Sequence, residues 1–127
     1  MRSAREAAER RGRFAEALSA VYLSFKGWKI IAHRARTHAG EIDLIAQRAG
    51  ILAIVEVKAR DRLDQGKLAI THSQQDRLVR AASLWRARSN LSADLQTRFD
   101  VIIIRPWRWP CHLPHAFQTS PRTKSLI

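Results

Sequence analysis

Four charged side chains stand within two stretches that otherwise have the composition of buried strands. They are Glu41, Asp43, Glu56 and Lys58, all within GEIDLIAQRAGILAIVEVKAR at residues 40–60. Burying a charge is costly unless the charge is paired or binds a metal. Three carboxylates and a lysine in this setting indicate a reaction centre.

The register of a hairpin decides whether these side chains meet. Successive side chains of a strand alternate between faces, so Glu41 shares a face with Asp43, and Glu56 with Lys58. If residues 49–50 form a two-residue loop, Asp43 lies opposite Glu56 and Glu41 lies opposite Lys58. A three-residue loop without a bulge would place Asp43 on the other face from Glu56. The sequence therefore predicts a charge cluster that depends on this register.

Such a cluster has the donor chemistry of a divalent metal site. Asp43 and Glu56 carry the hard oxygen ligands that Mg²⁺ or Mn²⁺ prefers, and the backbone carbonyl of Val57 is a third candidate. A metal there would activate a water and neutralise charge on a phosphate, while Lys58 would orient the water or stabilise the transition state. The alternative is a pair of cross-strand salt bridges, Lys58 with Asp43 or Glu41, on a solvated face. Apolar neighbours on the third strand favour the buried metal site.

Composition points to a polyanionic partner. The 127 residues suffice for about one domain, and Lys plus Arg number 23 against 11 for Asp plus Glu, a formal charge of +12. Nucleic acid is the commonest partner of such a chain, and a generic basic surface is the alternative. The single cysteine excludes an internal disulfide. No signal peptide and no apolar run of about 18 residues is visible, so we expect a soluble cytoplasmic protein without a membrane contact.

Helices and strands are predicted on both sides of the charged stretch. Residues 3–26 have helical spacing and end before Gly27, with an interruption near Gly12 left open. The apolar stripe of this helix is Phe14, Ala17, Leu18, Val21, Tyr22 and Phe25. Strands are expected at residues 28–35, 41–47, 51–59 and 99–105, with a polar loop over residues 61–71. A second helix is expected to begin with a capping box of Ser73 and Asp76 and to continue through Leu78, Ala81, Ala82 and Trp85.

The end of the chain is expected to be irregular. All four prolines lie at or after Pro106 and no periodicity follows, so we divide the chain into a domain at residues 1–105 and an irregular tail at residues 106–127. Trp107 and Trp109 could stack on unpaired bases, although packing over a sheet edge is the favoured expectation. For Asp100, before the tail, we expect a structural ion pair with Arg98 or another arginine.

Three motifs carry a resemblance to a known family. GEIDLIA, VEVKAR and RFDVIII, preceded by a helix that contains Ala15-Glu16, resemble the YraN-like family of small bacterial proteins. That family is similar to the restriction-endonuclease-like superfamily, which includes archaeal Holliday junction resolvases. The resemblance implies an α/β restriction-endonuclease-like core, with a mixed central sheet flanked by helices, and a metal-dependent nuclease site. Asp43, Glu56 and Lys58 match the superfamily motif, and Glu16 matches its first-helix glutamate.

Two positions fit the resemblance less well. Glu16 lies nearly opposite the apolar stripe of its helix, yet Ala20 and Leu23 lie on its side, so it is either a member of the site or a surface charge. Gln74 or Gln75 stands where the family tends to have a lysine, and a glutamine can bind phosphate only as a neutral hydrogen-bond partner.

The function expected from these residues is that of a Mg²⁺- or Mn²⁺-dependent endonuclease. Asp43, Glu56, Lys58 and Glu16 are the predicted catalytic residues, with Asp43, Glu56 and Val57 around the metal. DNA, including branched DNA, is favoured over RNA as the substrate. Arg77, Arg80 and Gln74 on the second helix are predicted to contact nucleic acid. The alternatives are a non-catalytic nucleic-acid-binding module and a scaffold with the same fold, and paired cuts would suit a homodimer.

Overall fold

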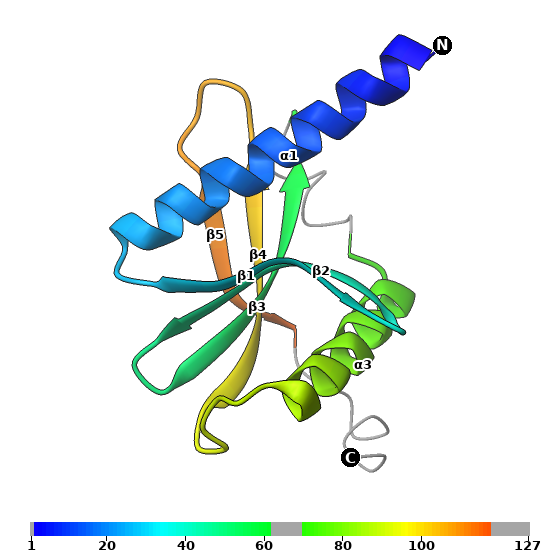
Figure 1. Cartoon of the computed structure of the whole chain (residues 1–127). Helices are drawn as coiled ribbons and strands as arrows, with labels where there is room; N and C mark the ends of the chain where they lie inside the picture. The colour runs from blue at the N-terminus through cyan, green and yellow to red at the C-terminus, as the bar shows by residue number, and fades with distance from the viewer. Residues whose placement is uncertain (1, 62–69, 118–127) are drawn as a thin grey trace.

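A twisted five-stranded sheet with a helix on each face forms the molecule (Figure 1). The computed structural model describes residues 2–61 and 70–117, and most of the predicted loop at residues 61–71 lies outside them. The elements in chain order are α1 (Arg2–Phe25), β1 (Lys29–Thr37), β2 (Gly40–Arg48), β3 (Ile51–Ala59), α3 (His72–Arg88), β4 (Gln96–Ile104) and β5 (Cys111–Phe117). The strands lie in the order β1-β2-β3-β4-β5, and β3 and β4 are parallel while the other neighbours are antiparallel. The predicted α/β class, with a mixed sheet flanked by helices, is confirmed.

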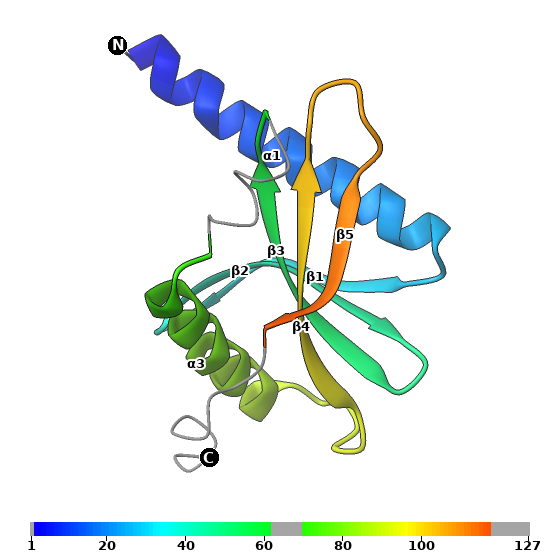
Figure 2. The same cartoon turned by 180° about the vertical axis from the view of Figure 1, so that it is seen from behind.

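Two apolar layers hold the sheet between the helices. On the α1 side, α1 contributes Ala15, Ala20 and Leu23 to a cluster that includes strand residues such as Leu44 and Val55. On the other side, α3 packs on β1 and β2 through an apolar cluster of its own. The view from behind shows α1 crossing β3, β4 and β5, while α3 lies beside the far end of the β1–β2 hairpin (Figure 2). No helix in the described ranges is long and apolar enough to cross a membrane.

The first helix buries a different face from the one predicted. It is continuous through Gly12 and ends at Phe25, two residues before Gly27, whose φ of 90° suits the turn that follows a helix. However, Phe14, Val21 and Phe25 of the predicted stripe are exposed. The buried face carries mostly small residues, Ala15, Ser19 and Ala20, together with Leu23. Small side chains let the helix lie close to a sheet face already filled by large aliphatic residues, and Glu16 lies beside this buried face.

The second helix begins two residues before the predicted capping box. Thr71 is its N-cap: the Thr71 hydroxyl accepts the N–H of Gln74 at 3.1 Å, and the Gln74 side chain accepts the N–H of Thr71 at 3.0 Å. The prediction of Ser73 and Asp76 as the box was therefore wrong. A glutamine reaches back to the cap residue, whereas the shorter aspartate reaches less far.

The predicted irregular tail contains a fifth strand. Residues 111–117 form β5, which pairs with β4 at one edge of the sheet, so the prediction of irregular chain from Pro106 is wrong for these residues. Pro114 is tolerated because an edge strand has one side free of a partner strand. Trp107 and Trp109, in the loop before β5, are 102% and 83% exposed, so they do not pack over the sheet edge as expected.

Candidate active site

The hairpin between β2 and β3 has the register on which the predicted site depends. Ala49 and Gly50 form a two-residue loop, and Arg48 lies opposite Ile51. The backbone pairing continues only as far as Leu44 opposite Val55. Beyond that point β2 runs toward α3 and β3 runs toward α1, so the two strands fork (Figure 1). The next positions in this register, Asp43 on β2 and Glu56 on β3, stand at the fork.

Asp43 bridges the fork through its side chain. Its Oδ2 accepts a hydrogen bond from the backbone N–H of Val57 at 2.8 Å, in place of the backbone pairing that has ended. Burial and the nearby Glu56 carboxylate raise the pKa of Asp43 to about 7, and Glu16 acts in the same direction. The Val57 hydrogen bond and Lys58 lower the pKa, but they only partly offset the increase. The fork therefore concentrates more negative charge than the chain itself neutralises.

Lys58 is the basic member of the cluster. Its Nζ lies 3.1 Å from Oε1 of Glu56, and both side chains are largely buried. The two residues are separated by one position on β3, so they point to the same side of the strand. Glu56 itself is 8% exposed, and the ammonium group of Lys58 is the cation that forms an ion pair with its carboxylate.

Glu16 joins the site through an arginine that the sequence analysis missed. Nε of Arg34 on β1 donates to Oε1 of Glu16 at 2.7 Å, and the glutamate side chain is only 18% exposed. The pKa of Arg34 is raised, first by this hydrogen bond and further by the charges of Glu41 and Asp43. Because His33 pairs with Leu44 and Ala35 with Ile42, Arg34 of β1 stands opposite Asp43 of β2. The hairpin rule applied to the turn at residues 37–40 would have found it.

Glu41 lies outside the cluster. It is exposed and approaches Arg36 of β1 at 3.7 Å, with side-chain exposures of 45% and 89%. The expectation that all four charges of the opening stretch would gather is therefore wrong for Glu41. The fork separates β2 from β3 before this position, which leaves Glu41 out of reach of Lys58.

The donors at the fork are suitable for a hard divalent cation. Asp43 and Glu56 offer carboxylate oxygens, and their mutual repulsion is the kind that a cation relieves. The N–H and C=O of a strand residue point to the same side, so the Val57 carbonyl faces the side on which its N–H meets Asp43. In the described part of the chain, no three side chains among His, Cys, Asp and Glu are grouped to hold a metal. The fitting set is thus two carboxylates and one backbone oxygen, with Glu16 held separately by Arg34.

The residues of α3 predicted to contact nucleic acid have different surroundings. Arg80 is exposed, whereas Gln74 uses its side chain in the helix cap. Arg77 lies over the turn between β1 and β2: a Cβ placed on Gly40 would stand 2.6 Å from Nη1 of Arg77. Arg80 thus keeps a free face toward solvent, while Gln74 and Arg77 are engaged within the fold.

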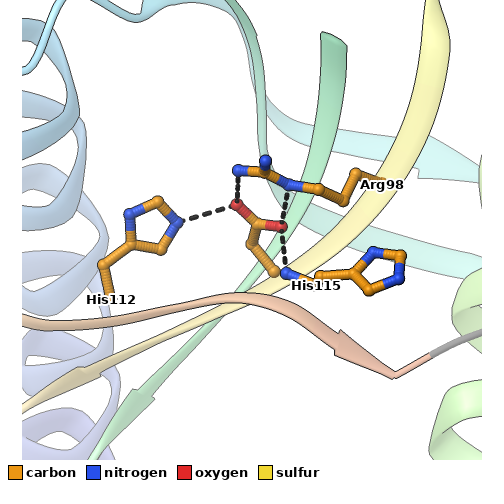
Figure 3. Close-up of polar contacts among 4 residues, drawn as sticks. Arg98, His112 and His115 are labelled. Carbon is orange, nitrogen blue, oxygen red and sulfur yellow. Dashed lines mark hydrogen bonds and ion pairs between the residues drawn. The ribbon is translucent and has the colours of Figure 1, made fainter.

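A second buried carboxylate lies on the neighbouring strand and is fully satisfied. Asp100 of β4 is 1% exposed, and Arg98 donates to both of its oxygens at 2.9 Å (Figure 3). Nε2 of His112 lies 2.7 Å from Oδ2, and the backbone N–H of His115 donates to Oδ1 at 3.0 Å. Burial raises the pKa of Asp100, but the hydrogen bonds from His112, Arg98 and His115 outweigh it and lower the pKa to about 2. The predicted pairing of Asp100 with Arg98 is confirmed.

Comparison with known proteins places the chain in a family. Residues 15–104 match the model of the uncharacterised protein family UPF0102. The chain belongs to the UPF0102 family. The matched region runs from α1 to the end of β4, so it includes every residue of the candidate site. The predicted membership in the YraN-like family is confirmed at this level.

Several members of the UPF0102 family align with nearly the whole chain. A UPF0102 protein of Rhodopseudomonas palustris (strain BisB18) is 50% identical over 117 residues, which cover 92% of this chain and 87% of the relative. A UPF0102 protein of Rhizobium meliloti is 46% identical, covering 85% of this chain and 88% of the relative. One from Maricaulis maris is 42% identical over the full length of both. These relatives carry the family name without an activity, so a function has to be argued from the site.

Proposed function

We propose that this UPF0102 protein is a metal-dependent nuclease that hydrolyses phosphodiester bonds in DNA, branched DNA included. The observation that carries the proposal is the pair of carboxylates at the fork, the partly buried Asp43 and the buried Glu56, where burial and the charge of Glu56 raise the pKa of Asp43 to about 7. A carboxylate that is costly to ionise in the free protein is expected at a site built for a cation. The resemblance of the surrounding motifs to restriction-endonuclease-like nucleases supports the same reading.

Asp43, Glu56 and the carbonyl of Val57 would hold Mg²⁺ or Mn²⁺. When bound, such an ion supplies an acidified water and neutralises charge that develops on a phosphate. The chain contributes the positions: the Val57 N–H fixes the Asp43 carboxylate, and the rigid strand fixes Glu56. Both acceptors thus stand on strands of the sheet rather than on a loop.

Lys58 and Arg34 would act on the phosphate and on the acidic cluster. Lys58, 3.1 Å from Glu56, carries the charge that can stabilise a phosphate oxygen as negative charge accumulates. Arg34 neutralises Glu16 and stands opposite Asp43 on the neighbouring strand, so it offsets part of the negative charge of the site. The excess of basic residues in the chain favours a polyanionic substrate that reaches this acidic point along a positive surface.

A cleavage assay tests the proposal. Linear duplex, single-stranded and four-way-junction DNA are incubated with the protein in Mg²⁺, in Mn²⁺ and in EDTA. Cleavage is expected only with metal, and Glu56→Gln is expected to lower the rate at least about 100-fold, the scale of losing one charge-stabilising group. Glu41→Gln is the matched control, because Glu41 is a nearby exposed carboxylate outside the cluster.

The results separate the proposal from its rival. Metal-dependent cleavage that survives Glu56→Gln would remove the assigned site. Salt-sensitive binding without cleavage of any of these substrates would instead identify a non-catalytic nucleic-acid-binding module. The close Lys58–Glu56 ion pair favours that alternative, because it occupies one oxygen of a proposed ligand.

A further inference from the structure

A large pocket opens near the carboxyl end of β3, the strand that carries Glu56 and Lys58. It has a volume of about 840 Å³ and lies between α1, the end of β3 and the loop that joins β4 to β5. Phe14 and Ala15 of its wall directly precede Glu16 on α1, and Arg60 stands two residues after Lys58. The pocket is therefore close to the candidate site along the chain, but no residue of that site lines it. Glu56 and Lys58 point to the face of β3 opposite Val55 and Val57.

The lining of this pocket is basic and aromatic. Its basic members are Arg10, Arg11, Arg60, Arg105 and Arg108, and Asp61 is the acidic one among the described lining residues. Trp107 and Phe14 are 102% and 66% exposed at its rim, so neither ring is used to fill the core. Nε of Arg105 is buried and has no hydrogen-bond partner among the described residues. Clustered arginines beside exposed rings suit a ligand with phosphates and planar bases.

We propose that this pocket binds single-stranded nucleic acid, with an unpaired base stacked on Trp107 and the backbone phosphates on its arginines. A stacked base must be unpaired, because the rings of paired bases are covered by their neighbours. Arginine recognises phosphate through paired N–H donors and also stacks on bases. The proposal goes beyond the proposed nuclease function, because no residue of the fork lines this pocket.

Two matched pairs of variants test the pocket. Trp107→Ala is compared with Trp109→Ala, because both tryptophans are exposed in the same loop but only Trp107 lines the pocket. Arg11→Glu is compared with Arg13→Glu, two exposed arginines of α1 of which only Arg11 lines it. All four side chains are exposed, so folding is expected to be unaffected.

Binding is measured in EDTA by the fluorescence anisotropy of labelled oligonucleotides of about 12 nucleotides, the size range of single-strand sites. Single-stranded DNA, single-stranded RNA and duplex DNA are used. Both single strands carry phosphates and unpaired bases, so comparison of the two shows whether the pocket prefers DNA or RNA. Trp107→Ala is expected to weaken single-strand binding about tenfold, and Trp109→Ala less than twofold. Arg11→Glu is expected to reduce the salt dependence of binding, and Arg13→Glu to change it less.

Equal losses of affinity in the two variants of each pair, or no single-strand binding by the unmodified chain, would overturn the assignment of the pocket as a nucleic-acid-binding site. Its failure is separable from that of the nuclease site, because binding in EDTA does not need cleavage. Cleavage that requires Glu56 while Trp107→Ala binds normally would reject the pocket alone. Binding that requires Trp107, in a chain that cleaves no substrate with metal, would retain the pocket and reject the nuclease.

Discussion

Two carboxylates on one sheet, the buried Asp100 and the partly buried Asp43, have opposite charge balances. Asp100 receives hydrogen bonds from Arg98, His112 and the backbone of His115, and its pKa is lowered to about 2. Asp43 receives one backbone hydrogen bond and faces Glu56, and its pKa is raised to about 7. Burial acts in the same direction on both, so the difference arises from their partners. The contrast separates a carboxylate that stabilises the fold from one that is available to a ligand.

Removal of the satisfied charge should have the largest effect on stability. Asp100→Asn leaves Arg98 beside a neutral group, and loss of one partner of a buried ion pair costs about 3 kcal/mol. We expect a loss of this size in the free energy of unfolding measured with urea. Asp94→Asn, a change at an exposed position before β4, serves as the control and should alter stability by less than about 0.5 kcal/mol. Equal stability of the two variants would show that Asp100 does not anchor β5.

Removal of the unsatisfied charge of Asp43 should instead increase the free energy of unfolding. Asp43→Asn keeps an oxygen for the Val57 N–H but removes a charge that burial and the neighbouring Glu56 both oppose, so it should stabilise the protein by about 2 kcal/mol at pH 8. Glu41→Gln, on the same strand in an exposed ion pair, should change stability by less than about 0.5 kcal/mol. A destabilised Asp43→Asn protein at pH 8 would contradict an excess of negative charge at the fork.

The stability changes caused by Asp43→Asn and by Asp100→Asn should depend on pH over two separate ranges. A raised carboxyl pKa is a penalty on the folded state above the unfolded pKa, so the gain from Asp43→Asn should fade as pH decreases from about 7 to 3.8. A lowered pKa contributes stability that is lost as pH falls through the folded value, so the loss from Asp100→Asn should shrink between about pH 4 and 2. Urea unfolding of both variants and the unmodified chain as a function of pH checks both ranges. If both stability changes varied over the same pH range, Asp43 and Asp100 would have similar pKa values, which would contradict the contrast between them.

The smallest expected effect is on one pKa. Lys58 lowers the pKa of Asp43, so Lys58→Met should raise it further. A ¹³C carboxyl NMR titration would measure the change, with Lys29→Met, an exposed position on β1, as the control. An unchanged pKa in Lys58→Met would place the lysine outside the electrostatic reach of Asp43.

The position of Asp43 beside Glu56 could be predicted from the sequence. A two-residue loop permits one register, and that register places Asp43 and Glu56 together whatever the rest of the chain does. Glu41 was misplaced because the strands fork, which depends on the packing of β2 against α3. Local spacing gives the pairing near a turn but carries no information on where two strands part.

Other parts needed tertiary contacts that the sequence does not show. The helical wheel of α1 favoured its largest apolar residues, but a close approach to the sheet requires Ala15 and Ser19 on the buried side. β5 was missed because its proline pattern is typical of irregular chain, and only its place at the sheet edge makes Pro114 acceptable. The partners of Asp100 on β5 were therefore not predicted either.

A titration of Asp43 with and without Mg²⁺ tests the central claim most directly. ¹³C carboxyl NMR of the unmodified chain should give a pKa of about 7 in EDTA and a value at least about one unit lower in saturating Mg²⁺, because a bound cation favours the ionised carboxylate. Asp100 in the same spectra should stay near 2 in both conditions. An Asp43 pKa that Mg²⁺ leaves unchanged would contradict the assignment of the fork as a metal-dependent active site.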